Sequence, residues 1–519
     1  MLTKKEIGSL LKNITIVKVL SIEKHPNADR LVLVNVEMES GKTKQVVTGA
    51  SNMKAGDLVP FLSGGHVVPG YLILHGKKIV LEPKDLRGVV SDSMILAEDE
   101  IGLSEDHTKI YVLEAKDEKL VGKSITEVLT KEQVEQIYQN SGLVELTPEL
   151  KEKIELIKSI ATNGGEIVGE EELPSILRSN EKLYTYDGFE PSGQMHIAQG
   201  IIRAINTNKM IKAGFTFRMW VADWFGYLNN KMDGDMEKIQ IVGKYFIEIW
   251  KAAGMDLDHV EFLWTSDFIG KKEYWETVMR VAKHTTLKRM LRTTEIMGRK
   301  ENDELSAAQI IYPCMQFTDI FKVMKCQVTQ LGLDQRKVNM LARELGPELG
   351  FWKPVVVSHG LLKGLNKPVE GKMDATERAI AMKMSKSKPD TAIFMTDTKE
   401  DVERKIQKAY CPEGEIDDNP ILDYCKQIIF EAHHLKGQEG LLKDGFTVKR
   451  DQKFGGDVTY KIFSELEADY KTKKLFPLDL KVAVADYLNK LIEPVRKHFE
   501  QDKKAKALLE QVQSFQITR

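Results

Sequence analysis

Along the first 130 residues, β-branched and other apolar residues occur in short runs, and turn-forming residues separate the runs. The runs span residues 14–20, 31–38, 45–48, 71–74 and 109–113. The separators include His25-Pro26-Asn27, Ser40-Gly41, Ser63-Gly64-Gly65 and Pro69-Gly70. Short strands at this spacing, bounded by turn signals, predict a small all-β barrel such as an OB-fold.

From about residue 124 the pattern changes to longer helical stretches. Residues 131–140 and 149–160 are charged and rich in helix formers, and Asn163-Gly164-Gly165 ends them. Strands then alternate with helices, which is typical of a parallel α/β sheet, and beyond about residue 396 the chain is mainly helical. We therefore expect four parts: an OB-fold domain 1–130, a linker 131–147, a Rossmann-type α/β domain 148–395 and a helical domain 396–519.

Composition narrows the class of protein without identifying a partner. The 519 residues are 42% hydrophobic and 29% charged, and no apolar run approaches the roughly 18 residues of a membrane span. We expect a cytosolic globular protein without a membrane segment. Its 75 basic and 77 acidic residues nearly cancel, so any nucleic acid must be bound by local basic patches. The four cysteines form no C-x-x-C pair and have no histidine cluster, so no structural metal is expected.

The first stretch with chemical content runs from residue 184 to residue 222. It reads as a strand at 184–186, a Pro-Ser-Gly turn at 191–193, a helix from His196 to just before Gly214, and a strand at 216–222. The turn follows the carboxyl end of a strand, where free backbone N–H groups and the helix dipole favour phosphate. His196 could donate to a phosphate oxygen, although a histidine taken alone is more often a surface helix residue.

A second motif, Lys-Met-Ser-Lys-Ser-Lys at 383–388, comes much later in the chain. Closely spaced lysines on a flexible loop can clamp a polyphosphate, whereas a lone charge run is usually a solvated loop. A strand–turn–His helix followed by K-M-S-K-S is the double signature of class I aminoacyl-tRNA synthetases, and the chain resembles that class. Two positions depart from the family pattern. Gln199 replaces the second histidine of H-I-G-H, and Pro389 stands where many members have glycine.

A third stretch places hydrogen-bonding side chains among apolar residues. Tyr312, Gln316 and Asp319 stand at i, i+4 and i+7, so they share one face of a helix. Burying such a row without partners is costly, which indicates a polar ligand; the alternative is an exposed helix face.

The chain resembles the tyrosyl branch of the class, in its archaeal and eukaryotic form, from about residue 146 to 499. The segments that carry the resemblance are 186–193, Ala222-Asp223, 312–316, Gly332-Leu-Asp-Gln-Arg-Lys337, the K-M-S-K-S loop and Lys453-Phe-Gly-Gly-Asp457. Tryptophanyl enzymes are the near competitor, and Asp319 together with the 332–337 segment favours tyrosine. A catalytically dead, RNA-binding relative is a further alternative, against which the intact motifs argue.

The resemblance implies roles for residues at the matching positions. For tyrosine these are Tyr186 and Asp319 at the phenol, Tyr312, Gln316 and Gln335 at the ammonium and carboxylate, and Glu190 and Asp223 in support. For ATP they are Gly188, Ser192, Gly193, His196, Gln199, Gly332, Asp334, Lys383, Met384, Ser385, Lys386 and Ser387. The expected catalytic residues are His196, Gln199, Lys383 and Lys386. The implied reaction is ligation of tyrosine to tRNA(Tyr) through tyrosyl-adenylate, with ATP entering as its Mg²⁺ complex.

The resemblance also implies how tRNA is bound. Phe454 and Asp479 match positions that read the anticodon, so residues 396–519 are expected to be the anticodon-binding domain, and 148–395 the catalytic domain. The first 130 residues resemble the tRNA-binding OB domain of bacterial phenylalanyl-tRNA synthetase β chains and of free tRNA-binding cofactors, on Lys24-His-Pro-Asn-Ala-Asp-Arg-Leu31 and Val46-Val-Thr-Gly-Ala-Ser-Asn52 among others. A dimerisation module is the alternative for this domain. The enzyme as a whole is expected to be a homodimer.

Overall fold

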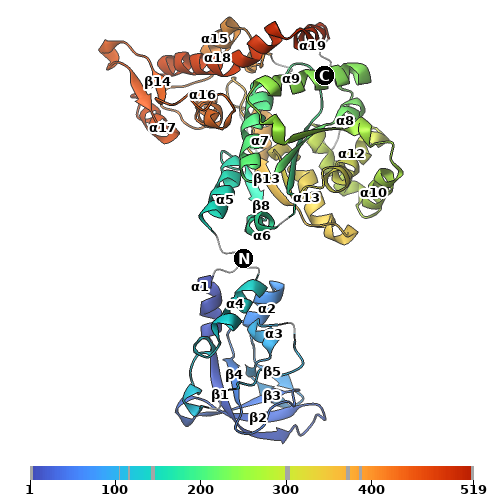
Figure 1. Cartoon of the computed structure of the whole chain (residues 1–519), viewed down its shortest axis with the longest axis vertical. Helices are drawn as coiled ribbons and strands as arrows, with labels where there is room; N and C mark the ends of the chain where they lie inside the picture. The colour runs from blue at the N-terminus through green and yellow to red at the C-terminus, as the bar shows by residue number, and fades with distance from the viewer. Residues whose placement is uncertain are drawn as a thin grey trace. The chain divides into compact units, whose positions relative to one another are not determined.

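The computed structural model describes residues 4–104, 106–114, 117–141, 147–179, 181–298, 304–369, 375–384 and 389–515. The chain forms two compact units, Met1–Leu146 and Thr147–Arg519 (Figure 1). Each unit has its own hydrophobic core. None of the helices in the described part of the chain combines the length and apolarity that a bilayer crossing requires.

The N-terminal unit is built on a five-stranded antiparallel sheet with the order β3-β2-β1-β4-β7. Its strands are β1 (Ile14–Lys24), β2 (Val32–Glu37), β3 (Thr43–Thr48), β4 (Leu58–Ser63) and β7 (Ser93–Ile95), and β5 (Lys84–Leu86) pairs with β6 (Val89–Ser91). Its helices are α1 (Lys4–Lys12), α2 (Pro69–His75), α3 (Glu98–Ile101) and α4 (Lys131–Asn140). The strands predicted at 14–20, 31–38 and 45–48 are confirmed by β1, β2 and β3.

Two of the predicted strands were wrong. Residues 71–74 lie in α2, because Pro69 occupies the start of that helix and Gly76, in the left-handed region at φ 65°, ends it. A four-residue apolar run is too short for its period to separate a strand from a helix. Residues 109–113 bury apolar side chains but pair only through one isolated bridge, at Ile110. Helix α4 falls among the residues expected as linker, and it buries Ile137 in the N-terminal core.

The second unit is centred on a six-stranded sheet with the order β11-β10-β9-β12-β13-β8. Its strands are β8 (Glu166–Val168), β9 (Tyr184–Phe189), β10 (Thr216–Val221), β11 (Val260–Trp264), β12 (Val328–Gly332) and β13 (Val355–His359). The five strands from β11 to β13 are parallel, and the edge strand β8 is antiparallel to β13. The strand order reverses between β9 and β12, because β9 continues to β10 on one side and meets β12 on the other. Ligands bind at such a switch point, beyond the carboxyl ends of the strands.

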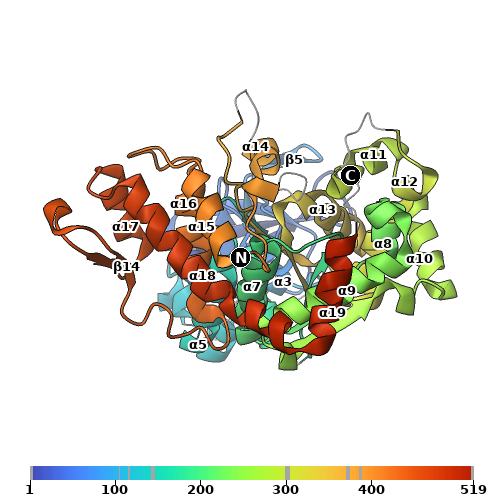
Figure 2. The same cartoon turned by 90° about the horizontal axis from the view of Figure 1, so that it is seen from above.

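Helices cover the sheet and extend beyond it (Figures 1 and 2). The first group is α5 (Pro148–Ile160), α6 (Leu173–Arg178), α7 (Arg203–Lys212), α8 (Asp223–Leu228), α9 (Met236–Ala252), α10 (Lys272–Lys283), α11 (Leu287–Thr293), α12 (Ala307–Thr318), α13 (Arg336–Leu345), α14 (Ala375–Met382) and α15 (Lys399–Lys408). The second group is α16 (Pro420–Tyr424), α17 (Phe463–Lys471), α18 (Pro477–Gln501) and α19 (Lys503–Ser514), with a hairpin of β14 (Phe446–Val448) and β15 (Val458–Tyr460).

The helical C-terminal part packs directly on the α/β part. Helices α18 and α19 both contact α9, where His498 meets Glu248 at 2.8 Å and the ring of Phe499 lies 5.4 Å from that of Tyr245. One hydrophobic cluster runs through both parts. The α/β part and the helices that follow it therefore form one body.

Candidate functional site

A cavity of about 420 Å³ opens beyond the carboxyl ends of the parallel strands. Most of the residues expected to bind a nucleotide or an amino acid line it: Gly188, Glu190, Ser192, His196, Gln199, Tyr312, Gln316, Gly332, Asp334, Gln335, Lys383 and Met384. Gly193 does not line it but turns the chain beside it at φ 58°. Ser385, Lys386 and Ser387 lie outside the described residues.

The histidine motif begins the helix that follows β9. A π-helical turn over Ala198–Ile202 leads into α7, and Gly214 stands just beyond the end of α7 at φ 107°. The backbone N–H of Gln199 donates to His196 Nδ1 at 3.3 Å. The Gln199 side-chain oxygen is buried and has no hydrogen-bond partner among the described residues. This glutamine, which departs from the family pattern, thus brings an unsatisfied acceptor to the cavity wall.

The carboxylate of Asp334 lies at the end of β12 and faces the second signature motif. Lys383 Nζ lies 3.0 Å from Asp334 Oδ2. Burial is the largest single influence and favours the protonated carboxyl, but the charge and hydrogen bond of Lys383, with the charges of His359 and Arg203, together outweigh it. The pKa of Asp334 therefore lies below its ordinary value. Gly332 leaves room for this carboxylate, because a Cβ at that position would lie 2.6 Å from Asp334 Oδ1.

Three residues of this wall were not predicted from the sequence. Arg203 pairs with the buried Asp187 at 2.7 Å and donates to the carbonyl of Gly188 at 2.9 Å. Burial raises the pKa of Asp187 to about 6, against the opposing charge of Arg203. Burial also lowers the pKa of His359 to about 4, so this histidine is neutral at pH 7. Only the position of His359, at the end of an apolar strand, could have signalled it from the sequence.

A second group of polar side chains surrounds Glu190. The hydroxyl of Tyr312 donates to Glu190 Oε1 at 2.7 Å, Asn229 donates to both of its oxygens, and Lys231 lies 3.5 Å away. Asn229 and Lys231 were missed because they come from a turn after α8, which no periodic pattern marks. Gln316, which also lines the cavity, donates to Gln335 at 3.4 Å.

Tyr186 and Asp319 lie behind this polar group and do not line the cavity. Both are fully buried, and neither the Tyr186 hydroxyl nor either Asp319 oxygen has a hydrogen-bond partner among the described residues. Burial raises the pKa of both groups well above their ordinary values. The Tyr274 hydroxyl, close to Asp319, offsets part of that rise, as Gln316 does at Tyr186, and the charge of Asp319 adds to the pKa shift of Tyr186. The row Tyr312, Gln316, Asp319 therefore runs from the cavity into its wall and ends at an unsatisfied acid.

Asp223 does not line the cavity. Its carboxylate accepts from the hydroxyl of Ser266 at 2.5 Å and from Gln240 at 3.2 Å, and the backbone N–H of Trp224 donates to it at 2.9 Å. These bonds fix the start of α8. The geometry brings Asp223 to the edge of the site and leaves its carboxylate engaged with protein groups.

Phe454 and Asp479 lie in the helical C-terminal part, away from the cavity. Phe454 is 52% exposed, and its ring centroid lies 6.3 Å from that of Phe476, which is also exposed. Asp479 lies in the first turn of α18, three residues after Phe476. The structure thus places two exposed rings next to each other, and Asp479 lies one helical turn after Phe476. Phe476 had not been singled out from the sequence.

Several known proteins are similar to this chain. The family model for class I tRNA synthetases (W and Y) matches residues 178–493, and a model described as a putative tRNA-binding domain matches residues 14–124. "Tyrosine--tRNA ligase 1, cytoplasmic" of Arabidopsis thaliana is 47% identical over 387 residues, 74% of this chain and 94% of that protein. The tyrosine–tRNA ligase of Thermococcus sibiricus is 39% identical and is covered over its whole length, against 72% of this chain.

Solved structures of aminoacyl-tRNA synthetases are also similar to this chain. The tyrosyl-tRNA synthetase of Pyrococcus horikoshii in complex with L-tyrosine superposes with a TM-score of 0.64 at 37% identity, over 70% of this chain and 99% of that one. The tryptophanyl-tRNA synthetase of Aeropyrum pernix, at 16% identity and a TM-score of 0.50, shares the fold alone.

Proposed function

Because this chain belongs to the class I tyrosyl-tRNA synthetases and is a tyrosine–tRNA ligase, we propose that Tyr186 and Asp319 receive the phenol of its substrate. The supporting observation is the pair of buried groups without partners. A phenolic hydroxyl donates one hydrogen bond and accepts others, so it satisfies an acid and a tyrosine together. Phenylalanine would leave both groups unpaired, which is the basis of the selectivity.

The polar group around Glu190 suits the other end of the amino acid. The substrate ammonium would lie near Glu190 and Tyr312, and Gln316 and Gln335 would hold the head of the molecule with their amides. Asp223 keeps α8 in place beside them. Glu190 is the one carboxylate among these four groups and supplies the negative charge that an ammonium needs. Lys231, 3.5 Å from it, would have to turn away for the ammonium to take its place.

The nucleotide would bind along the His196 turn and Asp334. We assign ribose hydroxyls to Asp334, which requires Lys383 to leave its present partner and turn to the phosphates. His196, Gln199, Lys383 and Lys386 would then stabilise the pyrophosphate side, and the backbone at Gly188, Ser192, Gly193, Met384, Ser385 and Ser387 would line the path.

The first step needs positioning and charge stabilisation but no general base. The tyrosine carboxylate is ionised at neutral pH, and its oxygen attacks the α-phosphorus of ATP while the bond to the bridging oxygen breaks. Pyrophosphate leaves with that electron pair, and its growing charge is what the signature side chains would stabilise. A ribose hydroxyl of the terminal adenosine of tRNA(Tyr) then takes the tyrosyl group and AMP leaves. Mg²⁺ would enter with ATP as part of the substrate complex.

Amino-acid-dependent ATP–pyrophosphate exchange tests these assignments. Tyrosine should support exchange, whereas phenylalanine and tryptophan should not at equal concentration. Lys383→Ala should slow adenylate formation while leaving the dissociation constant of tyrosine unchanged. An unchanged rate for that variant would contradict the assignment of Lys383 to the pyrophosphate side.

We further propose that Phe454 and Asp479 read the anticodon, joined by Phe476. An exposed ring can stack on an unstacked base, and a carboxylate one helical turn from Phe476 can accept from guanine N–H groups. This arrangement supports the assignment of residues 396–519 to anticodon binding.

The remaining assignments rest on surfaces outside the cavity. We propose that the five-stranded N-terminal sheet is an OB-type barrel that binds tRNA, in line with the matching family model.

An exposed apolar surface on α10 and α11 supports a homodimer through this region. It is formed by Trp275 and Met279, four residues apart on α10, and by Leu287 on α11. The name of the Arabidopsis relative supports a cytoplasmic location. Sedimentation of Met279→Glu, expected as a monomer where the parent chain is a dimer, tests the interface.

A further inference from the structure

The two signature motifs are joined by a short backbone pairing. The N–H of Ile197 donates to the carbonyl of Ile393 at 2.8 Å, and the N–H of Met395 donates to that of Met195 at 2.9 Å. His196 therefore sits between two hydrogen bonds to the segment that follows the lysine motif, opposite Phe394. Any shift of residues 393–395 would move the backbone of His196 with it.

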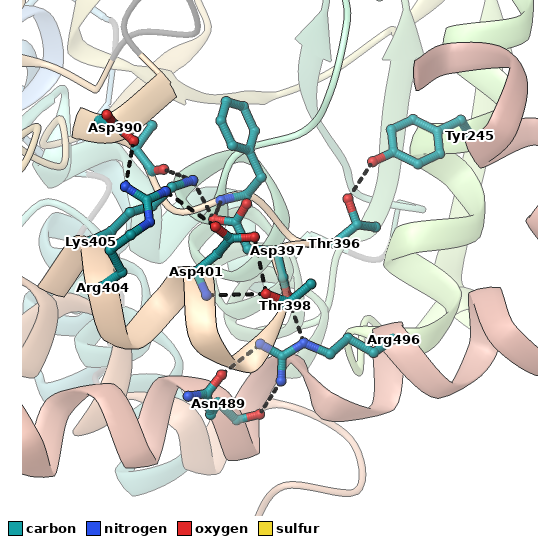
Figure 3. A network of polar contacts seen from close by, with 12 residues as sticks. Tyr245, Asp390, Thr396, Asp397, Thr398, Asp401, Arg404, Lys405, Asn489 and Arg496 are labelled. Atoms are coloured by element: carbon teal, nitrogen blue, oxygen red, sulfur yellow. Dashed lines mark hydrogen bonds and ion pairs between the residues drawn. The ribbon is translucent and has the colours of Figure 1, made fainter. Parts of the chain in front are cut away.

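A buried ion pair between Lys405 and Asp397 fixes the segment of residues 392–397. Lys405, on α15, has a side chain that is 4% exposed, and its Nζ lies 2.6 Å from Asp397 Oδ2 and 3.0 Å from the carbonyl of Ala392 (Figure 3). Asp397 Oδ2 also accepts from the N–H of Phe394 at 2.9 Å, and the ammonium lies 4.9 Å from the Phe394 ring. One lysine thus ties the start of the segment to the turn that ends it.

Helix α18 holds the same turn from the other side. Arg496 Nε donates to the carbonyl of Asp397 at 2.7 Å, and Arg496 Nη2 donates to Asn489 Oδ1 at 2.6 Å (Figure 3). Asn489 in turn donates to the carbonyl of Lys399 at 3.4 Å. At a rise of 1.5 Å per residue, Arg496 lies about 25 Å along this helix from Asp479 in its first turn.

We propose that Lys405 and Arg496 are positioning residues for adenylate formation, which act by fixing residues 392–397 against the His196 turn. A buried ion pair is a poor device for stability alone, because apolar side chains of similar volume often stabilise a core as well. What the pair supplies here is a fixed position for a segment that borders both motifs. The inference rests on the proposed role of His196 and the lysine loop, and it adds residues that touch neither substrate.

The test compares Lys405→Met with its matched control. Methionine keeps an unbranched side chain, one atom shorter than that of lysine, and removes its charge. Lys490→Met, on the exposed side of α18 where Lys490 pairs with Asp486 at 2.7 Å, removes a lysine that contacts no part of the segment. Both variants are titrated for active sites by the adenylate burst, and the rate constant of adenylate formation is measured per active site at saturating ATP and tyrosine.

We expect Lys405→Met to lower this rate constant by about 10- to 100-fold and to leave the dissociation constant of tyrosine unchanged. Arg496→Gln should lower the rate constant by about threefold to tenfold, and Lys490→Met should leave it unchanged. A purely structural role would reduce the number of active sites or the melting temperature and leave the rate per site intact. That result would overturn the proposal.

His196→Ala separates this inference from the assignment beneath it. If Lys405 acts through the His196 turn, the double variant His196→Ala/Lys405→Met should be slowed by clearly less than the product of the two single effects. Fully multiplicative effects would overturn the positioning role. An unchanged rate in His196→Ala alone would instead refute the proposed function of His196.

Discussion

Asp319→Ala removes one of the two groups proposed to select tyrosine. The carboxylate is fully buried and makes no hydrogen bond of ordinary geometry among the described residues. The Tyr274 hydroxyl is its nearby polar group, so the change should remove at most one weak contact from the apo protein. In the complex, tyrosine would satisfy both Asp319 and Tyr186, whereas phenylalanine would satisfy neither. The variant should therefore lose selectivity more than it loses stability.

The structure sets the size of the effect. An unpaired buried group costs about 1–3 kcal/mol, so the two groups together favour tyrosine over phenylalanine by about 2–6 kcal/mol. Removing one of them should reduce the ratio of kcat/KM for tyrosine to that for phenylalanine by about 5- to 150-fold, since about 1.4 kcal/mol corresponds to a factor of ten.

Pyrophosphate exchange with each amino acid gives the ratio directly. Tyr186→Phe, which removes only a hydroxyl, should reduce the ratio by a similar factor. Tyr470→Phe is the matched control: Tyr470 is also buried, but its hydroxyl donates to the carbonyl of Pro412 in the C-terminal part, so its selectivity should be unchanged. An Asp319→Ala enzyme with the parent ratio would refute the reasoning.

Three further predictions test other parts of the site. The pKa of His359 is about 4 in the folded chain against 6.5 in the unfolded chain, so protonation favours unfolding as pH falls from 6.5 to 4. Denaturant titration should show a loss of up to about 3 kcal/mol in the free energy of unfolding over this range, and His359→Gln should not show this loss. Gly332→Ala should raise the KM for ATP about tenfold, because the added Cβ would displace the Asp334 carboxylate. Gly270→Ala, where an added Cβ meets nothing within 4 Å, should leave this KM unchanged, and equal KM values for the two variants would count against Asp334 as the ribose site. Phe476→Ala should lower kcat/KM for tRNA by about 5- to 150-fold and leave pyrophosphate exchange intact, because stacking on one base contributes about 1–3 kcal/mol; loss of both activities would contradict a role confined to the anticodon.

Periodicity and turn chemistry were sufficient to predict some of the elements that carry the site, but not β12 or β13. The strand, the turn and the helix around His196 were predicted, and the shared face of Tyr312, Gln316 and Asp319 was read from spacing alone. These features are local, because they depend on residues a few positions apart. The same reasoning failed for residues 71–74, where the short apolar run did not reveal that Pro69 and Gly76 bound a helix.

Contacts between distant segments could not be predicted in this way. Two ion pairs of the site are examples: Arg203 with Asp187, and Lys383 with Asp334. The sequence around one partner contains nothing that identifies the other. The row on α12 and the π-helical turn that follows it was predicted as a set. Only the structure shows that Tyr312 donates to Glu190 while Asp319 has no hydrogen bond of ordinary geometry among the described residues. The family resemblance pointed to both Tyr312 and Asp319. The burial of Asp319 gives the physical reason why its carboxyl group is expected to bind a ligand.

A crystal structure of this chain with bound tyrosine tests the central claim most directly. The account predicts the phenolic oxygen at hydrogen-bond distance, roughly 2.6–3.2 Å, from both the Tyr186 hydroxyl and an Asp319 carboxylate oxygen. A phenol that points to solvent, or that leaves Asp319 without a partner, would contradict it.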